Sequence, residues 1–176
     1  GLILVEPKEG LLKVDKEFYV AQGEFYSASD MGDKGLQVFD AKKMLDGHPD
    51  YIVFNGRTKG TVGNMSAKVG DKVRIYFGNG GVNLVSSFHV IGEIFDKVYP
   101  EAAIGSEPHK NVQSTIVPSG GATIVEFGLE VPGNYILVDH ALARLDRGAW
   151  GTIKVEGPEN KEIFDGVSDM SGNSGH

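Results

Sequence analysis

Hydrophobic residues occur along the chain in short runs that are separated by glycine, proline and asparagine. Many runs are rich in β-branched and aromatic residues, as in Tyr51-Ile-Val-Phe54, and such segments are typical of β-strands. Turn signals such as Gly78-Asn-Gly-Gly81 and Pro118-Ser-Gly-Gly121 lie between them. Because many short strands with regular turns make up sandwiches and barrels, an all-β fold is expected. The predicted strands are Leu2–Val5, Glu17–Phe25, Tyr51–Asn55, Lys72–Gly78, Ser86–Ile91, Gln113–Val117, Thr123–Phe127, Asn134–Asp139 and Gly151–Glu156.

Helices are expected at only two places, Ala41–Leu45 and Ala141–Leu145, and both are short. From about Pro158 the pattern becomes polar and contains glycine and serine, so residues 158–176 are predicted to form a tail or a linker. Residues 1–157 are then a single domain. The chain opens with the apolar run Gly1-Leu-Ile-Leu-Val5 and has no initiator methionine. This beginning suggests a fragment or a processed chain.

Composition removes several classes of function. The 176 residues carry a net charge of -7, so no broad electropositive surface is expected and nucleic acid is an unsuitable partner. The chain has no cysteine, which excludes disulfides, thiolate nucleophiles and a blue-copper centre built within the chain.

Two of the five histidines lie in predicted strands or at their ends. Period-two alternation puts His89 on one face with Ser87 and Ile91, and puts His140 on the face of Ile136 and Val138. An imidazole near neutral pH can bind a metal or transfer a proton. The competing interpretation is a pair of core histidines satisfied by nearby polar groups, and their spacing in the sequence does not decide between the two.

The remaining histidines indicate no site. His48 precedes Pro49 in a predicted turn, His109 is expected in a surface loop, and His176 is the last residue. A hydrolase that combines a histidine with Glu93, Asp96 or Asp139 is a rival hypothesis, but the chain has no Gly-x-Ser-x-Gly motif.

The end of the predicted sandwich has a recognisable pattern. Gly133-Asn-Tyr-Ile-Leu-Val-Asp-His140, a loop, and Gly148-Ala-Trp-Gly-Thr-Ile-Lys-Val155 resemble the last two strands of a cupredoxin. In copper-binding cupredoxins the intervening loop carries a cysteine, a histidine and usually a methionine. Here Asp139 falls at about the cysteine position and Trp150 lies near the methionine position. The resemblance implies a cupredoxin-like Greek-key β-sandwich with one or two short helices and without a type 1 copper site of its own.

Longer runs resemble the copper-containing nitrite reductases. They are residues 1–7, 14–20, 51–56, 83–99, 111–118 and 137–142, of which the run Asn83-Leu-Val-Ser-Ser-Phe-His-Val-Ile-Gly-Glu-Ile-Phe-Asp-Lys-Val-Tyr99 is the most specific. The resemblance extends to about residue 157 and implies the second, C-terminal cupredoxin domain of such an enzyme. A piece of a multicopper oxidase is disfavoured because His-x-His motifs are absent.

The resemblance also implies roles for particular residues. His140 matches a ligand of the type 2 copper, which in this family is shared between subunits, and His89 matches the catalytic histidine that relays a proton to nitrite. Ile91 matches the aliphatic residue that limits how the substrate sits. A backbone carbonyl and a hydroxyl orient the catalytic imidazole from the segment Gln113-Ser114-Thr115, and the hydroxyl belongs to Ser114 or Thr115.

At the level of the whole enzyme, the resemblance implies a periplasmic or outer-membrane-attached homotrimer that reduces nitrite to nitric oxide in denitrification. The type 1 copper is expected on a first cupredoxin domain that precedes Gly1, and an external cupredoxin or cytochrome c is the expected electron donor. The alternative is a metal-free cupredoxin-like module that serves interaction or trimerisation.

Overall fold

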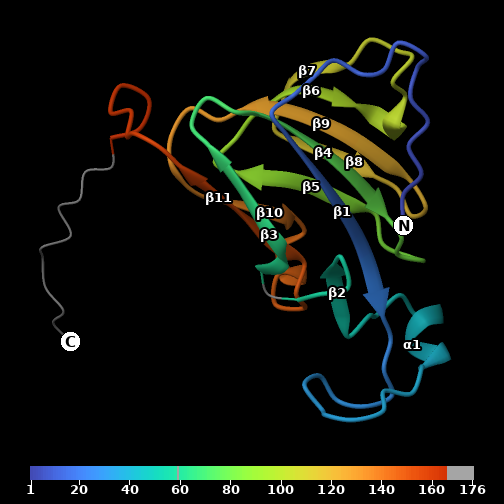
Figure 1. Ribbon diagram of the computed structural model, residues 1–176. Coiled ribbons are helices and arrows are strands. Elements are labelled where there is room, and N and C mark those ends of the chain that lie inside the picture. The colour runs from blue at the N-terminus through green and yellow to red at the C-terminus, as the bar shows by residue number, and fades with distance from the viewer. Residues whose placement is uncertain (59, 166–176) are drawn as a thin grey trace, which may run out of the picture.

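The computed structural model describes residues 1–58 and 60–165, and its strands form two stacked sheets (Figure 1). The helical elements are the short α-helix α1 (Ala41–Leu45) and the 3₁₀ turns η1 (Pro100–Ala102) and η2 (Leu142–Arg144). The strands are β1 (Lys16–Phe25), β2 (Tyr51–Phe54), β3 (Gly60–Lys68), β4 (Lys72–Asn79), β5 (Ser86–Ile91), β6 (Phe95–Tyr99), β7 (His109–Val112), β8 (Ser114–Val117), β9 (Ala122–Gly128), β10 (Gly133–Asp139) and β11 (Trp150–Glu156).

One sheet has six strands in the order β2-β1-β4-β9-β6-β7, and the other has five in the order β3-β11-β10-β5-β8. Neighbouring strands are mostly not consecutive along the chain, as with β4 beside β9 and β10 beside β5, so the chain crosses between the sheets as in a Greek-key sandwich. The pairs β1–β4 and β3–β11 are parallel, whereas the other registered pairs are antiparallel. The predicted all-β sandwich with short helices is confirmed.

The core between the sheets is built on a chain of phenylalanines. Phe88 of β5 is fully buried and stacks on Phe77 of β4 with the ring centroids 4.1 Å apart, and it also stacks on Phe95 of β6 at 6.0 Å. Because side chains alternate along a strand, burying Ser86, Phe88 and Val90 turns Ser87, His89 and Ile91 to the outer face of the second sheet. The core therefore fixes which face carries the candidate histidines.

One predicted strand is wrong. Leu2–Val5 has no regular structure and joins no sheet. The side chain of Leu2 packs over Gly78 of β4, whereas Ile3 is 93% exposed. The helix expected at Ala141–Leu145 is only the 3₁₀ turn η2.

Three strands were not predicted. β3 has few hydrophobic residues, and its pairing with β11, for example Met65 opposite Ile153, holds it in place. β6 and β7 lie together at the other sheet's edge, so His109 begins a strand, although it is exposed as expected.

Residues 158–165 contain a turn but no strand or helix, and residues 166–176, with His176, lie outside the described part. Within the described part, no helix is long and apolar enough to cross a membrane.

Candidate functional site

The two candidate histidines lie side by side on the outer face of the second sheet. β5 and β10 are antiparallel neighbours, with His89 opposite Val138, and the backbone N–H of His140 donates to the carbonyl oxygen of Ser87 at 2.8 Å. The ring centroids of His89 and His140 are 5.3 Å apart and the rings are inclined at 63°. His89 is half-buried and His140 is exposed. The structure thus brings together two residues whose spacing in the sequence did not indicate a common site.

The imidazole of His89 has a defined orientation. Its Nδ1 lies 2.5 Å from the carbonyl oxygen of Gln113, the residue just before β8. Since a carbonyl oxygen only accepts hydrogen bonds, Nδ1 must carry the proton, and Nε2 of the neutral ring keeps a free lone pair. Gln113 therefore selects the tautomer of His89 and leaves Nε2 available for chemistry.

The register of β8 separates the two candidate hydroxyls. Ser114 lies directly opposite His89 and is exposed on the same face. Thr115 lies opposite the core residue Phe88 and is only 8% exposed, so its side chain lies on the inner face. Strand geometry thus favours Ser114 as the hydroxyl neighbour of the imidazole.

Aliphatic side chains surround the histidine pair. Ile91 lies two residues beyond His89 on the same face, is 41% exposed, and pairs across the strands with Ile136. Val138, opposite His89, is fully buried although it belongs to the outer face. The face that carries the imidazoles therefore combines the aliphatic Ile91 and Val138 with the polar Ser87 and Ser114.

The carboxylates of the hydrolase hypothesis do not join the histidine pair. Asp139 is fully buried and accepts hydrogen bonds from Gln22 and Arg144, on the opposite face of β10 from His140. Glu93 lines a separate hollow of about 660 Å³ with Asp96 and Glu130. Burial, together with those two carboxylates, raises the pKa of Glu93 to about 7. Among the described residues that line this hollow, Gln113 is the one that also belongs to the candidate site.

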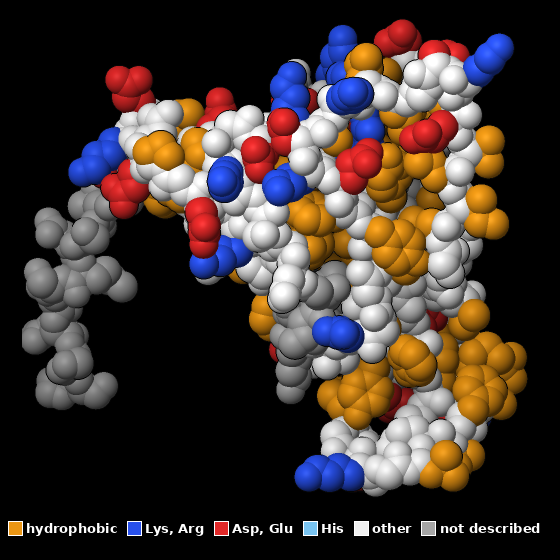
Figure 2. Space-filling model, in the orientation of Figure 1, with side chains coloured by type: hydrophobic (Ala, Val, Ile, Leu, Met, Phe, Trp, Pro, Cys, Tyr) orange, Lys and Arg blue, Asp and Glu red, His pale blue; other side chains and the backbone are white. Residues whose placement is uncertain are grey.

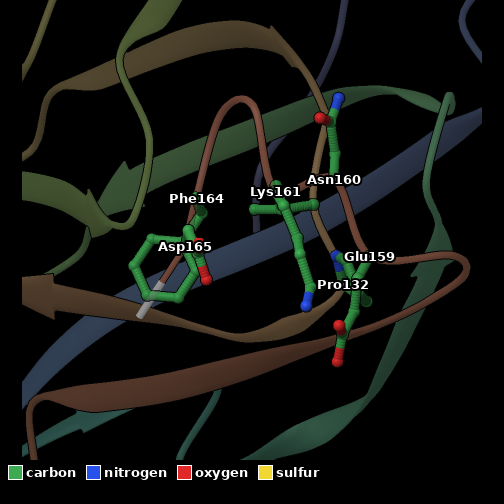
Figure 3. Close-up of a pocket in the computed structure, with 7 residues that line it drawn as sticks. Pro132, Glu159, Asn160, Lys161, Phe164 and Asp165 are labelled. Carbon is green, nitrogen blue, oxygen red and sulfur yellow. The ribbon is translucent and has the colours of Figure 1, made fainter. Parts of the chain in front are cut away.

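A second hollow, of about 360 Å³, contains none of the candidate residues. It is lined by the turn at Val131 and Pro132 and by the segment from Glu159 to Asp165. Figure 3 shows Glu159, Lys161 and Phe164 around it.

The donor set fits part of a copper site. Imidazole nitrogens are suitable copper ligands, and here two imidazoles lie close together. Within residues 1–58 and 60–165, however, no three histidine, cysteine, aspartate or glutamate side chains are grouped to hold a metal. A copper ion at this pair would need further ligands from elsewhere.

The sequence did not reveal Arg144 as part of the site's surroundings. This residue of η2 donates to the carboxylate of Asp139 and to the carbonyl oxygen of Val85. The sequence signal that could have pointed to Arg144 is Asp139, an aspartate at the end of an apolar strand. A carboxylate buried at such a position needs a partner of opposite charge.

Comparison with known proteins gives a consistent result. No family model matches the chain. The copper-containing nitrite reductase of Neisseria meningitidis serogroup A is 59% identical over 167 residues, which cover 93% of this chain and 43% of that protein. The solved copper nitrite reductase of Nitrosomonas europaea superposes with a TM-score of 0.72 at 30% identity, over 86% of this chain and 53% of that one.

A multicopper oxidase structure has a TM-score of 0.68 at 22% identity, covering 87% of this chain and 48% of that one, which bears on the fold alone. The predicted cupredoxin-like fold is confirmed by these structural neighbours. The chain spans less than half the length of the meningococcal relative. The chain is thus a homologue of one part of the copper-containing nitrite reductases, and it has the fold of a single cupredoxin-like domain.

Proposed function

We propose that this chain is the second cupredoxin domain of an enzyme that reduces nitrite to nitric oxide. In this proposal residues 1–157 form the domain and residues 158–176 a tail, His140 is a ligand of the type 2 copper, and His89 is the catalytic proton relay. The observation that carries it is the pairing of the two imidazoles 5.3 Å apart on an outer face, in a chain 59% identical to a copper-containing nitrite reductase.

His89 is suited to transfer protons because Gln113 fixes its ring. With Nδ1 donating to the Gln113 carbonyl, Nε2 can accept a proton from water and donate it to a substrate oxygen. The same arrangement would also suit a metal ligand, since ligating histidines commonly donate their second N–H to a carbonyl. Only the family resemblance separates the role of His89 from that of His140, so the experiment below addresses both.

The reaction needs one electron and two protons for each nitrite, and it yields nitric oxide and water. Copper, when bound, would supply redox and Lewis-acid chemistry. The chain's own contribution is to present the His140 imidazole as a ligand, to deliver a proton from His89, and to restrict the substrate's position with Ile91. Ser114, opposite His89, would support the orientation of the imidazole.

The remaining ligands are proposed to come from the first cupredoxin domain of a neighbouring subunit in a homotrimer. The incomplete donor set in the described residues supports this arrangement. Hydrophobic side chains also gather on the surface around β2 and α1 (Figure 2), and the exposed residues of this region include Phe25, Phe39 and Leu45. Such patches are typical of surfaces covered in an assembly.

Electron supply is proposed to begin outside this chain. A type 1 copper requires a cysteine, and the chain has none, so that centre is assigned to the first domain. An external cupredoxin or cytochrome c would reduce it. By family resemblance, the enzyme is placed in the periplasm or on the outer membrane.

Substitution of the two histidines in the complete, copper-loaded protein tests these roles. His140→Ala should remove the type 2 copper and abolish nitrite reduction, whereas His89→Ala should keep the copper and lower turnover by about 10². The matched control is His109→Ala, which removes an exposed histidine of β7 and should change neither quantity. Copper content, the type 2 electron paramagnetic resonance signal and nitric oxide production are the measurements.

The outcomes separate the competing assignments. Loss of copper from His89→Ala would make His89 a ligand. Full copper and normal turnover in His140→Ala would contradict the proposed site and favour the metal-free module.

A further inference from the structure

Asp139 is a buried carboxylate that contacts both β5, which carries His89, and the loop that begins after His140. It is 0% exposed, and its carboxylate lies on the inner face of β10, opposite to the face of His140. It therefore cannot touch a metal or a substrate at the histidine pair. A buried carboxylate is costly unless hydrogen bonds and a counter-charge compensate it, so its partners indicate what the position does.

One oxygen of Asp139 holds the backbone next to each histidine. Oδ1 accepts from the backbone N–H of Ser87, two residues before His89, at 3.1 Å. The same atom accepts from the N–H of Ala141, the residue after His140, at 3.3 Å. A single side-chain atom thus contacts the backbone of both β5 and the start of the His140 loop, in addition to the backbone hydrogen bond from His140 to Ser87.

The other oxygen anchors this junction to the rest of the sandwich. Oδ2 accepts from Arg144 of η2 and, at 3.0 Å, from the side-chain amide of Gln22 in β1. The amide oxygen of Gln22 in turn accepts from the hydroxyl of Ser86 at 2.7 Å. Both oxygens and the negative charge are compensated inside the fold.

Arg144 closes the loop onto the strand of His89. Its guanidinium pairs with Asp139 and also donates to the carbonyl oxygen of Val85, just before β5, at 2.6 Å. The arginine belongs to the loop that follows His140, so the ion pair ties that loop to β5. Both contacts come from Nη1, whose two N–H groups serve the carboxylate of Asp139 and the carbonyl oxygen of Val85.

We infer that Asp139 and Arg144 are positioning residues, which hold His140 and His89 at the separation that the proposed copper site requires. This inference rests on the proposed function and extends it from the two imidazoles to the buried ion pair beneath them. Removing the charge of Asp139 should let the His140 loop move relative to β5 while both imidazoles remain present.

The test compares Asp139→Asn, Arg144→Gln and Arg144→Lys in the complete, copper-loaded protein. Asp139→Asn and Arg144→Gln should weaken copper binding at the type 2 site about 10- to 100-fold, the usual effect of losing groups that support a ligand. Both should also change the line shape of the type 2 electron paramagnetic resonance signal. Arg144→Lys keeps the positive charge and should have a smaller effect than Arg144→Gln.

Glu126→Gln is the matched control, because Glu126 forms a buried ion pair with Arg74 in the other sheet. It should lower stability without changing the copper signal. In the metal-free protein, the ring-proton NMR shifts of His89 and His140 should change in Asp139→Asn but not in Glu126→Gln. Partial unfolding of a variant would reduce the amplitude of its type 2 electron paramagnetic resonance signal and leave the line shape unaltered.

Arg144→Gln keeps the contacts of Asp139 with Ser87 and Ala141, so it tests the same ion pair if Asp139→Asn does not fold. Wild-type copper affinity, spectrum and ring shifts in a folded variant of either residue would overturn the inference. If His140→Ala loses copper while these variants keep it unchanged, only the positioning role fails. If His140→Ala retains copper, the proposed function itself fails.

Discussion

Glu93 is a half-buried carboxyl group whose environment disfavours ionisation. Burial raises its pKa from 4.5 to about 7, and the negative charges of Asp96 and Glu130 add to the effect, whereas a hydrogen bond from the backbone of Ile94 opposes it. Between pH 4.5 and 7 the folded state therefore binds more protons at this position than the unfolded state. By linkage, the contribution of Glu93 to the free energy of unfolding falls as the pH rises through that window.

Glu93→Gln should consequently stabilise the protein in a pH-dependent way. The variant should match the wild type near pH 4.5 and exceed it by about 1–2 kcal/mol above pH 7.5, a value reduced from the full shift because the side chain is partly solvated. Urea denaturation at several pH values measures the difference. Glu159→Gln, at an exposed position, is the control. A difference that stays constant with pH would show that the ionisation of Glu93 is not coupled to folding.

The sequence alone could not decide which hydroxyl lies beside the imidazole of His89. The sequence placed both Ser114 and Thr115 in the same segment, and only the register of β8 with β5 puts Ser114 on the outer face and Thr115 on the inner one. A shift of one residue would exchange the two faces, and that choice depends on pairing across the sheet. The partnership of Asp139 with Arg144 depends likewise on the path of the loop after His140.

At the scale of elements, β5 connects the core to the site. Phe88 fills the core between Phe77 and Phe95, and the next residue, His89, points outward. Phe88→Ala should lower the free energy of unfolding by about 3–5 kcal/mol, because it removes a fully buried ring and leaves a cavity. Chemical denaturation measures this loss. Ile116→Ala, on the exposed side of β8, is the control, and an equal loss in both variants would contradict the central place of Phe88.

Strands could be predicted where the alternation of hydrophobic residues was strong. The prediction failed where a segment becomes a strand only through its pairing with a neighbour. β5, with buried positions at Ser86, Phe88 and Val90, was predicted with its observed bounds, as was α1. β3 could not be found because it is polar and gains its order from β11. Leu2–Val5 has strand-like composition, but Leu2 packs over Gly78 while the backbone joins no sheet.

At the scale of the whole molecule, the domain presents one proposed copper ligand, His140, where a copper site needs three or more. His89 and His140 stand on the outer face without a third histidine or carboxylate grouped with them in the described residues. A site that is completed by another polypeptide should bind copper weakly when this chain is alone, because each missing ligand removes both coordination energy and geometric constraint.

We therefore expect the isolated 176-residue chain to bind copper(II) with a dissociation constant of about 1 μM or weaker. The complete protein should bind it at least about 10²-fold more tightly, because the chain supplies only one proposed ligand, His140, of the coordination shell. Competition with a chelator measures both values. His48→Ala and His109→Ala, at exposed positions outside β5 and β10, control for adventitious binding. Tight binding of one equivalent by the isolated chain, lost in His140→Ala, would mean that the chain completes a site by itself. In that case the proposal of a copper shared between subunits would be wrong, even though His140 would remain a ligand.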